Sequence, residues 1–138
     1  MLTRNDLQQL AQLRLDDAIL LHQAGRSSSA YYLAGYSIEL ALKACIAKLF
    51  QPDVIPDRAF VNAIYTHKLD SLVGTAGLRT QFDADTKADP QFAAYWMAVS
   101  QWSEESRYKF WDSIQSGTLL EAINEPSHGV FQWVTRYW

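Results

Sequence analysis

The segment from Ala30 to Phe50 constrains the fold more than any other part of the chain. Its leucine, isoleucine and alanine residues point in nearly every direction around a helix. A surface helix carries one apolar stripe, whereas a helix that is apolar on most sides is covered on most sides. The pattern therefore predicts a central helix surrounded by others. Small residues such as Ala34, Gly35 and Ala41 favour a close approach of these neighbours.

One narrow arc of this predicted helix is not aliphatic. It holds Tyr32, Tyr36, Glu39 and Lys43, at spacings of four, three and four. A carboxylate on a central helix needs a cation, because an unpaired buried charge is strongly destabilising. Lys43 can pair with Glu39 within the helix, and Arg14 falls in the apolar stripe of the preceding segment. We therefore expect a buried cluster of Arg14, Glu39, Lys43 and Arg107, with tyrosine hydroxyls completing its hydrogen bonds.

Capping residues mark the ends of other helices. Thr3, with Asp6 three residues later, predicts a helix start, and Gly25 predicts the end of the same helix. Asp89 followed by Pro90 predicts another start. The predicted helices span Thr3–Ala24, Ala30–Phe50, Arg58–Ile64, Lys68–Ala76, Asp89–Trp102 and a segment from Ser116 or Thr118 to Trp138.

The intervening segments are predicted as loops. Thr80–Lys87 is polar, and Ser103–Trp111 is charged and aromatic. Pro126 and Gly129 should kink or split the last helix. No segment alternates with the period of a strand. Because most connections are short, we expect one all-α domain over residues 1–138, an antiparallel bundle of four to six helices around a long, largely apolar second helix.

Composition excludes several classes of protein. The 138 residues carry a net charge of −3, which argues against a general nucleic-acid coat. The single cysteine, Cys45, excludes an internal disulfide and a multi-thiolate metal site. No apolar run approaches the roughly 20 residues that cross a bilayer, and the first residues lack the pattern of an export signal. We expect a cytoplasmic protein with no cofactor, no metal and no membrane partner.

Three motifs in a fixed order carry a family resemblance. They are the string from Ala30 to Ala44, which reads AYYLAGYSIELALKA, then His67-Lys68-Leu69, then Glu105-Ser106-Arg107-Tyr108. From about Asp6 to Trp133 the chain resembles a HEPN domain. The resemblance implies an antiparallel helical bundle, a homodimer and a role in prokaryotic toxin–antitoxin or phage-defence systems. Members of the family include metal-independent endoribonucleases, nucleotide binders and partners of minimal nucleotidyltransferases.

The ribonuclease branch of that family uses an arginine followed, after four to six residues, by a histidine. The arginine neutralises the scissile phosphate and the histidine transfers a proton. Seven residues separate Arg14 from His22, eight separate Arg58 from His67, and His128 precedes Arg136. No histidine follows Arg107 at the required spacing. The missing motif disfavours a ribonuclease, and no catalytic residue is assigned.

Arg107 and Lys109 form a small cationic spot among aromatic residues. Such a spot suits a nucleotide, since rings stack on bases and guanidinium groups bind phosphate oxygens. Alternatively, Arg107 is the buried counter-charge of Glu39. The candidate ligand-binding residues are Tyr32, Tyr36, Glu39, Lys43, His67, Arg107 and Tyr108. The aromatic end of the chain, Phe131–Trp138, either docks on the bundle or contributes to a dimer interface.

Three functional hypotheses follow. The first is a non-catalytic HEPN-like homodimer that binds a nucleotide, an RNA segment or a partner protein. The second is a metal-independent endoribonuclease toxin with a non-standard site, such as Arg107 with His67. The third is an accessory subunit of a minimal nucleotidyltransferase.

Overall fold

Helix α2 (Ser27–Ala47) lies at the centre of the protein, whose computed structural model describes residues 1–138. Thirteen of its 21 residues are buried, so the prediction of a central helix is confirmed. The helix begins three residues before its predicted start. The serines of the predicted connector form its first turn, and Arg26 takes the N-cap position without a side-chain hydrogen bond.

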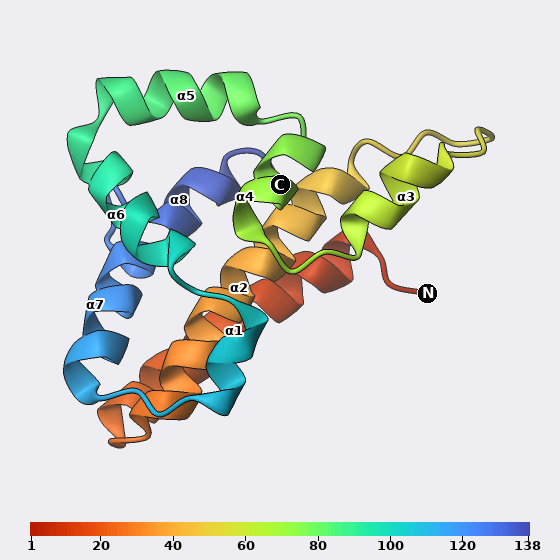
Figure 1. Cartoon of the computed structure of the whole chain (residues 1–138). Coiled ribbons are helices and arrows are strands. Elements are labelled where there is room, and N and C mark those ends of the chain that lie inside the picture. The colour runs from red at the N-terminus through yellow and green to blue at the C-terminus, as the bar shows by residue number, and fades with distance from the viewer.

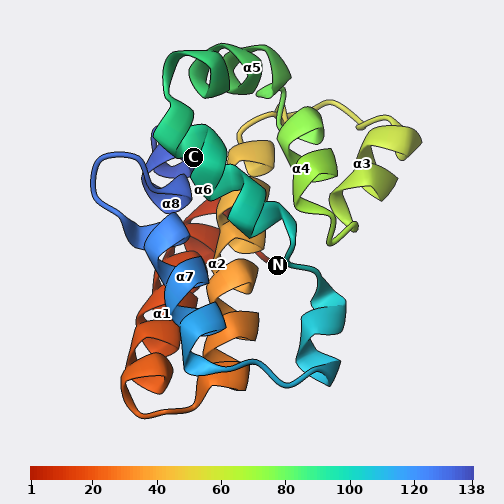
Figure 2. The same cartoon turned by 60° about the vertical axis from the view of Figure 1, so that its left-hand side comes forward.

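The other elements pack either on α2 or on the helices that contact it, with α3 and α5 at the periphery (Figures 1 and 2). They are α1 (Arg4–Gln23), α3 (Arg58–Ile64), α4 (Leu69–Thr75), α5 (Arg79–Ala88), α6 (Pro90–Ser100), the 3-10 helix η1 (Glu104–Tyr108), α7 (Ser113–Asn124) and α8 (Val130–Thr135). Helix α1 runs antiparallel to α2 along its length, and α7, α8 and α4 pack against other parts of α2. The all-α class is confirmed. None of the helices combines the length and the apolar character that crossing a bilayer requires.

The predicted caps are confirmed. Thr3 and Asp6 form a reciprocal capping box at the start of α1, and Gly25 follows the end of that helix with a φ of 77°. Asp89 caps α6, where its carboxylate accepts two backbone N–H groups of the first turn, and Pro90 occupies the first helical position.

The prediction of a loop at Thr80–Lys87 is wrong, because this segment forms most of α5. Phe82 is the only buried residue of this helix, and its ring packs edge-on against Trp96 with ring centroids 4.9 Å apart. A single buried residue leaves no apolar stripe in the sequence. The helix is held by tertiary contacts of Phe82 and Asp85 with α6 and α8, which helical periodicity cannot reveal.

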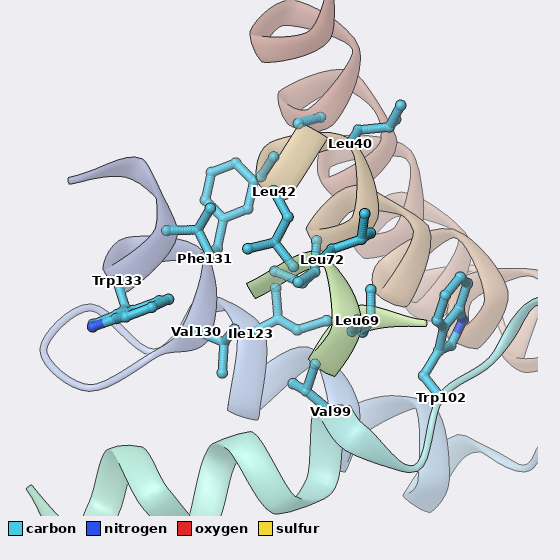
Figure 3. Packing of buried hydrophobic residues seen from close by; sticks show 14 of the residues in the cluster. Leu40, Leu42, Leu69, Leu72, Val99, Trp102, Ile123, Val130, Phe131 and Trp133 are labelled. Atoms are coloured by element: carbon cyan, nitrogen blue, oxygen red, sulfur yellow. The ribbon is translucent and has the colours of Figure 1, made fainter. Parts of the chain in front are cut away.

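The C-terminal stretch docks on the bundle. The chain divides between α7 and α8 around Pro126 and Gly129, as predicted. Phe131 and Trp133 of α8 are buried in one cluster of 30 buried residues, part of which Figure 3 shows. The same cluster takes in Ile123 of α7, so the two halves of the predicted last helix share one core.

A segment that we call the strap, Trp102–Trp111, crosses the N-terminal half of α2. At one end the Trp102 indole lies directly on Gly35, and its Nε1 donates to the carbonyl oxygen of Tyr32 at 3.1 Å. At the other end Trp111 stacks on Tyr31 with ring centroids 3.7 Å apart. Both ends of the strap are therefore attached to the central helix.

Replacing Gly35 with alanine tests this attachment. The new Cβ would lie 2.2 Å from the nearest indole atoms of Trp102, so the ring must leave its place. We expect Gly35→Ala to lower the free energy of unfolding by about 2 kcal/mol, measured by urea denaturation. Gly74→Ala is the control, since a Cβ there meets nothing within 4 Å. Equal stability of the two variants would contradict the packing described.

Candidate functional site

The seven predicted site residues form two groups along one face of α2. Arg107 and Tyr108, on the strap, lie beside Tyr32. His67, from the linker between α3 and α4, joins Glu39 and Lys43. Tyr32 and Glu39 are seven residues apart, which is about 10 Å along a helix axis. The structure therefore brings the predicted residues to one face but separates them into a cationic end and a buried carboxylate.

Glu39 is buried, with 2% of its side chain exposed. Its Oε1 lies 2.9 Å from Lys43 Nζ and 2.9 Å from His67 Nδ1. No protein donor lies within hydrogen-bonding distance of its Oε2. The prediction of a buried carboxylate with a cation is confirmed. His67 keeps 47% of its side chain exposed, so the group reaches solvent mainly through the imidazole.

The predicted partners Arg14 and Arg107 are wrong, because neither forms an ion pair with Glu39. Helix α1 turns Leu15 into the core, and the partly exposed Arg14 pairs with Asp17 at 3.4 Å. Arg107 lies beside Tyr32, about two turns of α2 before Glu39. Arg14 still acts at longer range. Burial and the Glu39 charge raise the pKa of Tyr36, and the charge of Arg14 opposes them.

Arg107 lines a hollow of about 260 Å³ beside the first turns of α2. Its lining residues are Ser28, Ser29, Tyr32, Leu33, Arg107 and Lys109. None of them is acidic, and neither Arg107 nor Lys109 belongs to any ion pair of the structure. Hydrogen bonds with the Tyr108 and Tyr32 side chains raise the pKa of Arg107. The hollow therefore presents two uncompensated positive charges.

Aromatic rings continue this surface along α2. The ring of Tyr32 lies parallel to that of Tyr36, with centroids 6.0 Å apart, and 6.1 Å from that of Trp102. On the outer side, the Arg107 guanidinium lies 4.9 Å from the ring centroid of Tyr108. The cations thus lie beside one exposed ring, that of Tyr108, and two partly buried rings, those of Tyr32 and Tyr36.

Ser28 and Ser29 were not predicted as site residues. The sequence suggested a polar connector, whereas both residues belong to the first turn of α2. Ser28 also fixes the strap, since its Oγ accepts the backbone N–H of Trp111 at 2.9 Å. The only sequence pattern that could have identified Ser28 as a site residue is its spacing of four from Tyr32, which places the two on one helix face.

Comparison of the chain with protein-family models, with curated proteins and with solved structures gives no match. The geometry of the two groups is therefore the basis for a functional proposal.

Replacing Glu39 tests the buried group. Glu39→Ala leaves the Lys43 ammonium without its acceptor and should lower the free energy of unfolding by about 2–4 kcal/mol, measured by chemical denaturation. Glu39→Gln, which keeps an acceptor oxygen, should cost less. Asp83→Ala, which removes an exposed carboxylate of α5, is the control. If Glu39→Ala unfolds like the control, the ion group contributes nothing to the fold.

Proposed function

We propose that this chain is a HEPN-like binding module without catalytic activity, which binds the phosphate and base of a nucleotide or of a single-stranded RNA segment. The observation that carries the proposal is the hollow beside α2, where Arg107 and Lys109 are unpaired and no lining residue is acidic. The resemblance to the HEPN family adds a role in a prokaryotic defence or toxin–antitoxin system.

The chemistry of the hollow suits a phosphate group. The Arg107 guanidinium can bind two phosphate oxygens at once, and Lys109 adds a second positive charge. The Ser29 side chain supplies a hydroxyl donor at the same place, whereas the Ser28 hydroxyl is bonded to the backbone of Trp111. Since the whole chain carries a net charge of −3, this positive surface is local, and it favours a ligand with few phosphates over a long duplex.

The rings around the hollow suit a base. Tyr108 and Phe110 are exposed on the strap, and Phe110 is 99% exposed. An aromatic side chain that no part of its own chain covers is a platform on which a base can stack. The rings and the cations alternate along the strap, as single-stranded nucleic acid requires.

Replacing Arg107 tests the proposal. Loss of a charged hydrogen-bond donor costs about 1.5–3 kcal/mol, so Arg107→Gln should weaken binding of a fluorescent adenosine nucleotide at least roughly tenfold. The titration is followed by anisotropy at fixed salt, because salt screens the contact. Arg58→Gln makes the same change of charge on α3 and should bind like the parent. Binding that is unaffected by Arg107→Gln would contradict the proposal.

The ribonuclease hypothesis and the accessory-subunit hypothesis predict different results when the same protein is mixed with RNA or nucleotide. A ribonuclease would cleave RNA without added metal and would lose this activity in His67→Ala. Arg107 and His67 lie at opposite ends of the α2 face, which does not favour their joint action on one phosphate. If the parent protein binds neither nucleotide nor RNA, an accessory role beside a nucleotidyltransferase becomes the better hypothesis.

Homodimer formation belongs to the same proposal. Ile114 of α7 and Met97 of α6 are large exposed apolar side chains, and such residues are enriched in protein interfaces. We expect a dimer in analytical ultracentrifugation and a shift towards monomer in Ile114→Ser. Leu20→Ser, which changes an exposed apolar residue of α1, is the control. A monomeric parent protein would remove the dimer from the proposal.

A further inference from the structure

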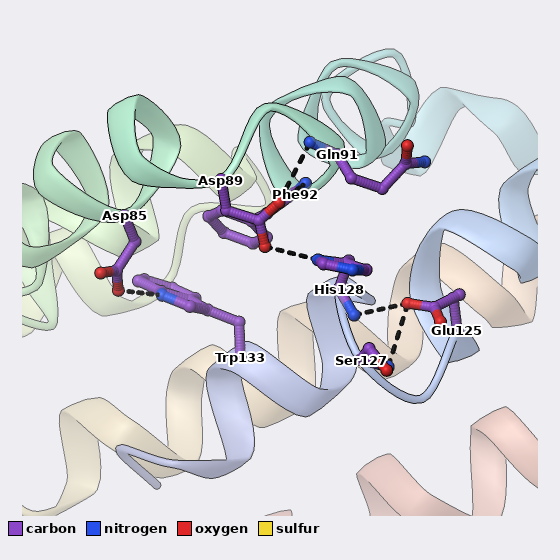
Figure 4. A network of polar contacts seen from close by, with 8 residues as sticks. All are labelled: Asp85, Asp89, Gln91, Phe92, Glu125, Ser127, His128 and Trp133. Atoms are coloured by element: carbon purple, nitrogen blue, oxygen red, sulfur yellow. Dashed lines mark hydrogen bonds and ion pairs between the residues drawn. The ribbon is translucent and has the colours of Figure 1, made fainter.

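A second cluster of titratable residues lies far from α2's first turns, where α5, α6 and the α7–α8 connection meet (Figure 4). His128 Nδ1 lies 2.7 Å from Asp89 Oδ2. The carboxylate also accepts two backbone N–H groups at the start of α6. With Nδ1 donating to Asp89, the Nε2 atom is the ring nitrogen left for another partner.

Hydrogen bonds to the backbone of residues 127 and 128 also fix the position of His128. Glu125 accepts the backbone N–H groups of Ser127 and His128. The hydrogen bond with Asp89 raises the pKa of His128, burial acts against this rise, and the charges of Asp89 and Glu125 add to it. The ring therefore carries a proton more readily than an ordinary histidine does.

The imidazole lines a hollow of about 90 Å³ together with Arg136. Phe92 and Trp133 form apolar walls. The second carboxylate of the lining, that of Asp85, accepts the Trp133 Nε1–H at 2.8 Å and lies 3.4 Å from the Tyr137 hydroxyl. Both acidic residues are thus occupied by donors from the protein.

The Arg136 guanidinium, by contrast, has no acidic partner in the structure. A purely structural role of Asp89 and His128 in fixing the α7–α8 connection does not account for an unpaired arginine beside them. The volume, about a third of that beside Arg107, is too small for a base and suits a compact group. Arg136 and His128 line this one small space, and both of its carboxylates already accept hydrogen bonds from the protein, so these two cations are the groups left for a small anion.

We propose that this hollow binds a small oxyanion, a phosphate or a carboxylate group, held by the Arg136 guanidinium and the His128 ring. Asp89 orients that ring, so it acts as a positioning residue. This site is separate from the hollow at Arg107, and it does not depend on the nucleotide proposal. Asp85, Asp89 and Glu125 surround the site with negative charge, so the anion should bind more tightly as the pH falls and His128 gains its proton.

The three histidines of the chain make a direct test. The side-chain 15N resonances of His22, His67 and His128 are followed by NMR while inorganic phosphate is added at constant ionic strength. We expect saturable shifts of the His128 resonances only. His22, whose Nδ1 lies 2.8 Å from Ser116 Oγ, and His67 are internal controls for the fold and for non-specific effects. A parallel titration with acetate shows whether a carboxylate binds as well.

Three variants make the result specific. Arg136→Gln should abolish the saturable His128 shift while leaving the His22 and His67 signals unchanged, and Arg58→Gln should leave the shift intact. Asp89→Asn should lower the pKa of His128 and weaken phosphate binding without abolishing it. Absence of a His128 shift with both anions, persistence of the shift in Arg136→Gln, or equal shifts at all three histidines would overturn the proposal.

Discussion

The contact between Trp102 and Gly35 is the constraint on which the cationic end of the molecule depends. A glycine at this position lets the indole lie on the backbone of α2, and the indole N–H then bonds the carbonyl of Tyr32. With Trp111 stacked on Tyr31, the strap has two attachments, and Arg107 lies between them. A side chain as long as arginine binds an anion well only when its backbone is fixed, because each mobile segment that must be ordered reduces affinity.

The buried carboxylate of Glu39 connects the same helix to the linker between α3 and α4. Its charge is tolerated because one oxygen meets both Lys43, one turn along α2, and His67, from the linker between α3 and α4. The pair within the helix is available as soon as α2 forms, whereas the histidine requires the linker to dock. Glu39 thereby makes the position of the α3–α4 region depend on the central helix. The group is a tertiary connection, and its one exposed member is the imidazole.

The sequence revealed the centre of the fold more fully than the site. The all-round apolar pattern of α2 identified the central helix and the burial of Glu39, because burial follows from periodicity alone. Lys43, the partner within the helix, was predicted correctly. The tertiary partner was not, because periodicity does not say whether Arg14, Arg107 or His67 lies beside Glu39. The choice among them depends on which turn of α2 each segment crosses. Helix α5 was missed for a similar reason, because tertiary contacts of Phe82 and Asp85 fix it rather than an apolar stripe.

The position of the Trp102 ring is the most direct test of the account, because it determines where the strap and its cations lie. NMR can observe it through nuclear Overhauser effects between the indole protons of Trp102 and the Hα protons of Gly35, and through the exchange rate of the indole N–H. We predict strong Overhauser effects and an N–H that exchanges only with global unfolding. Absent effects and an N–H that exchanges as fast as that of a free indole would show that the strap is not held on α2.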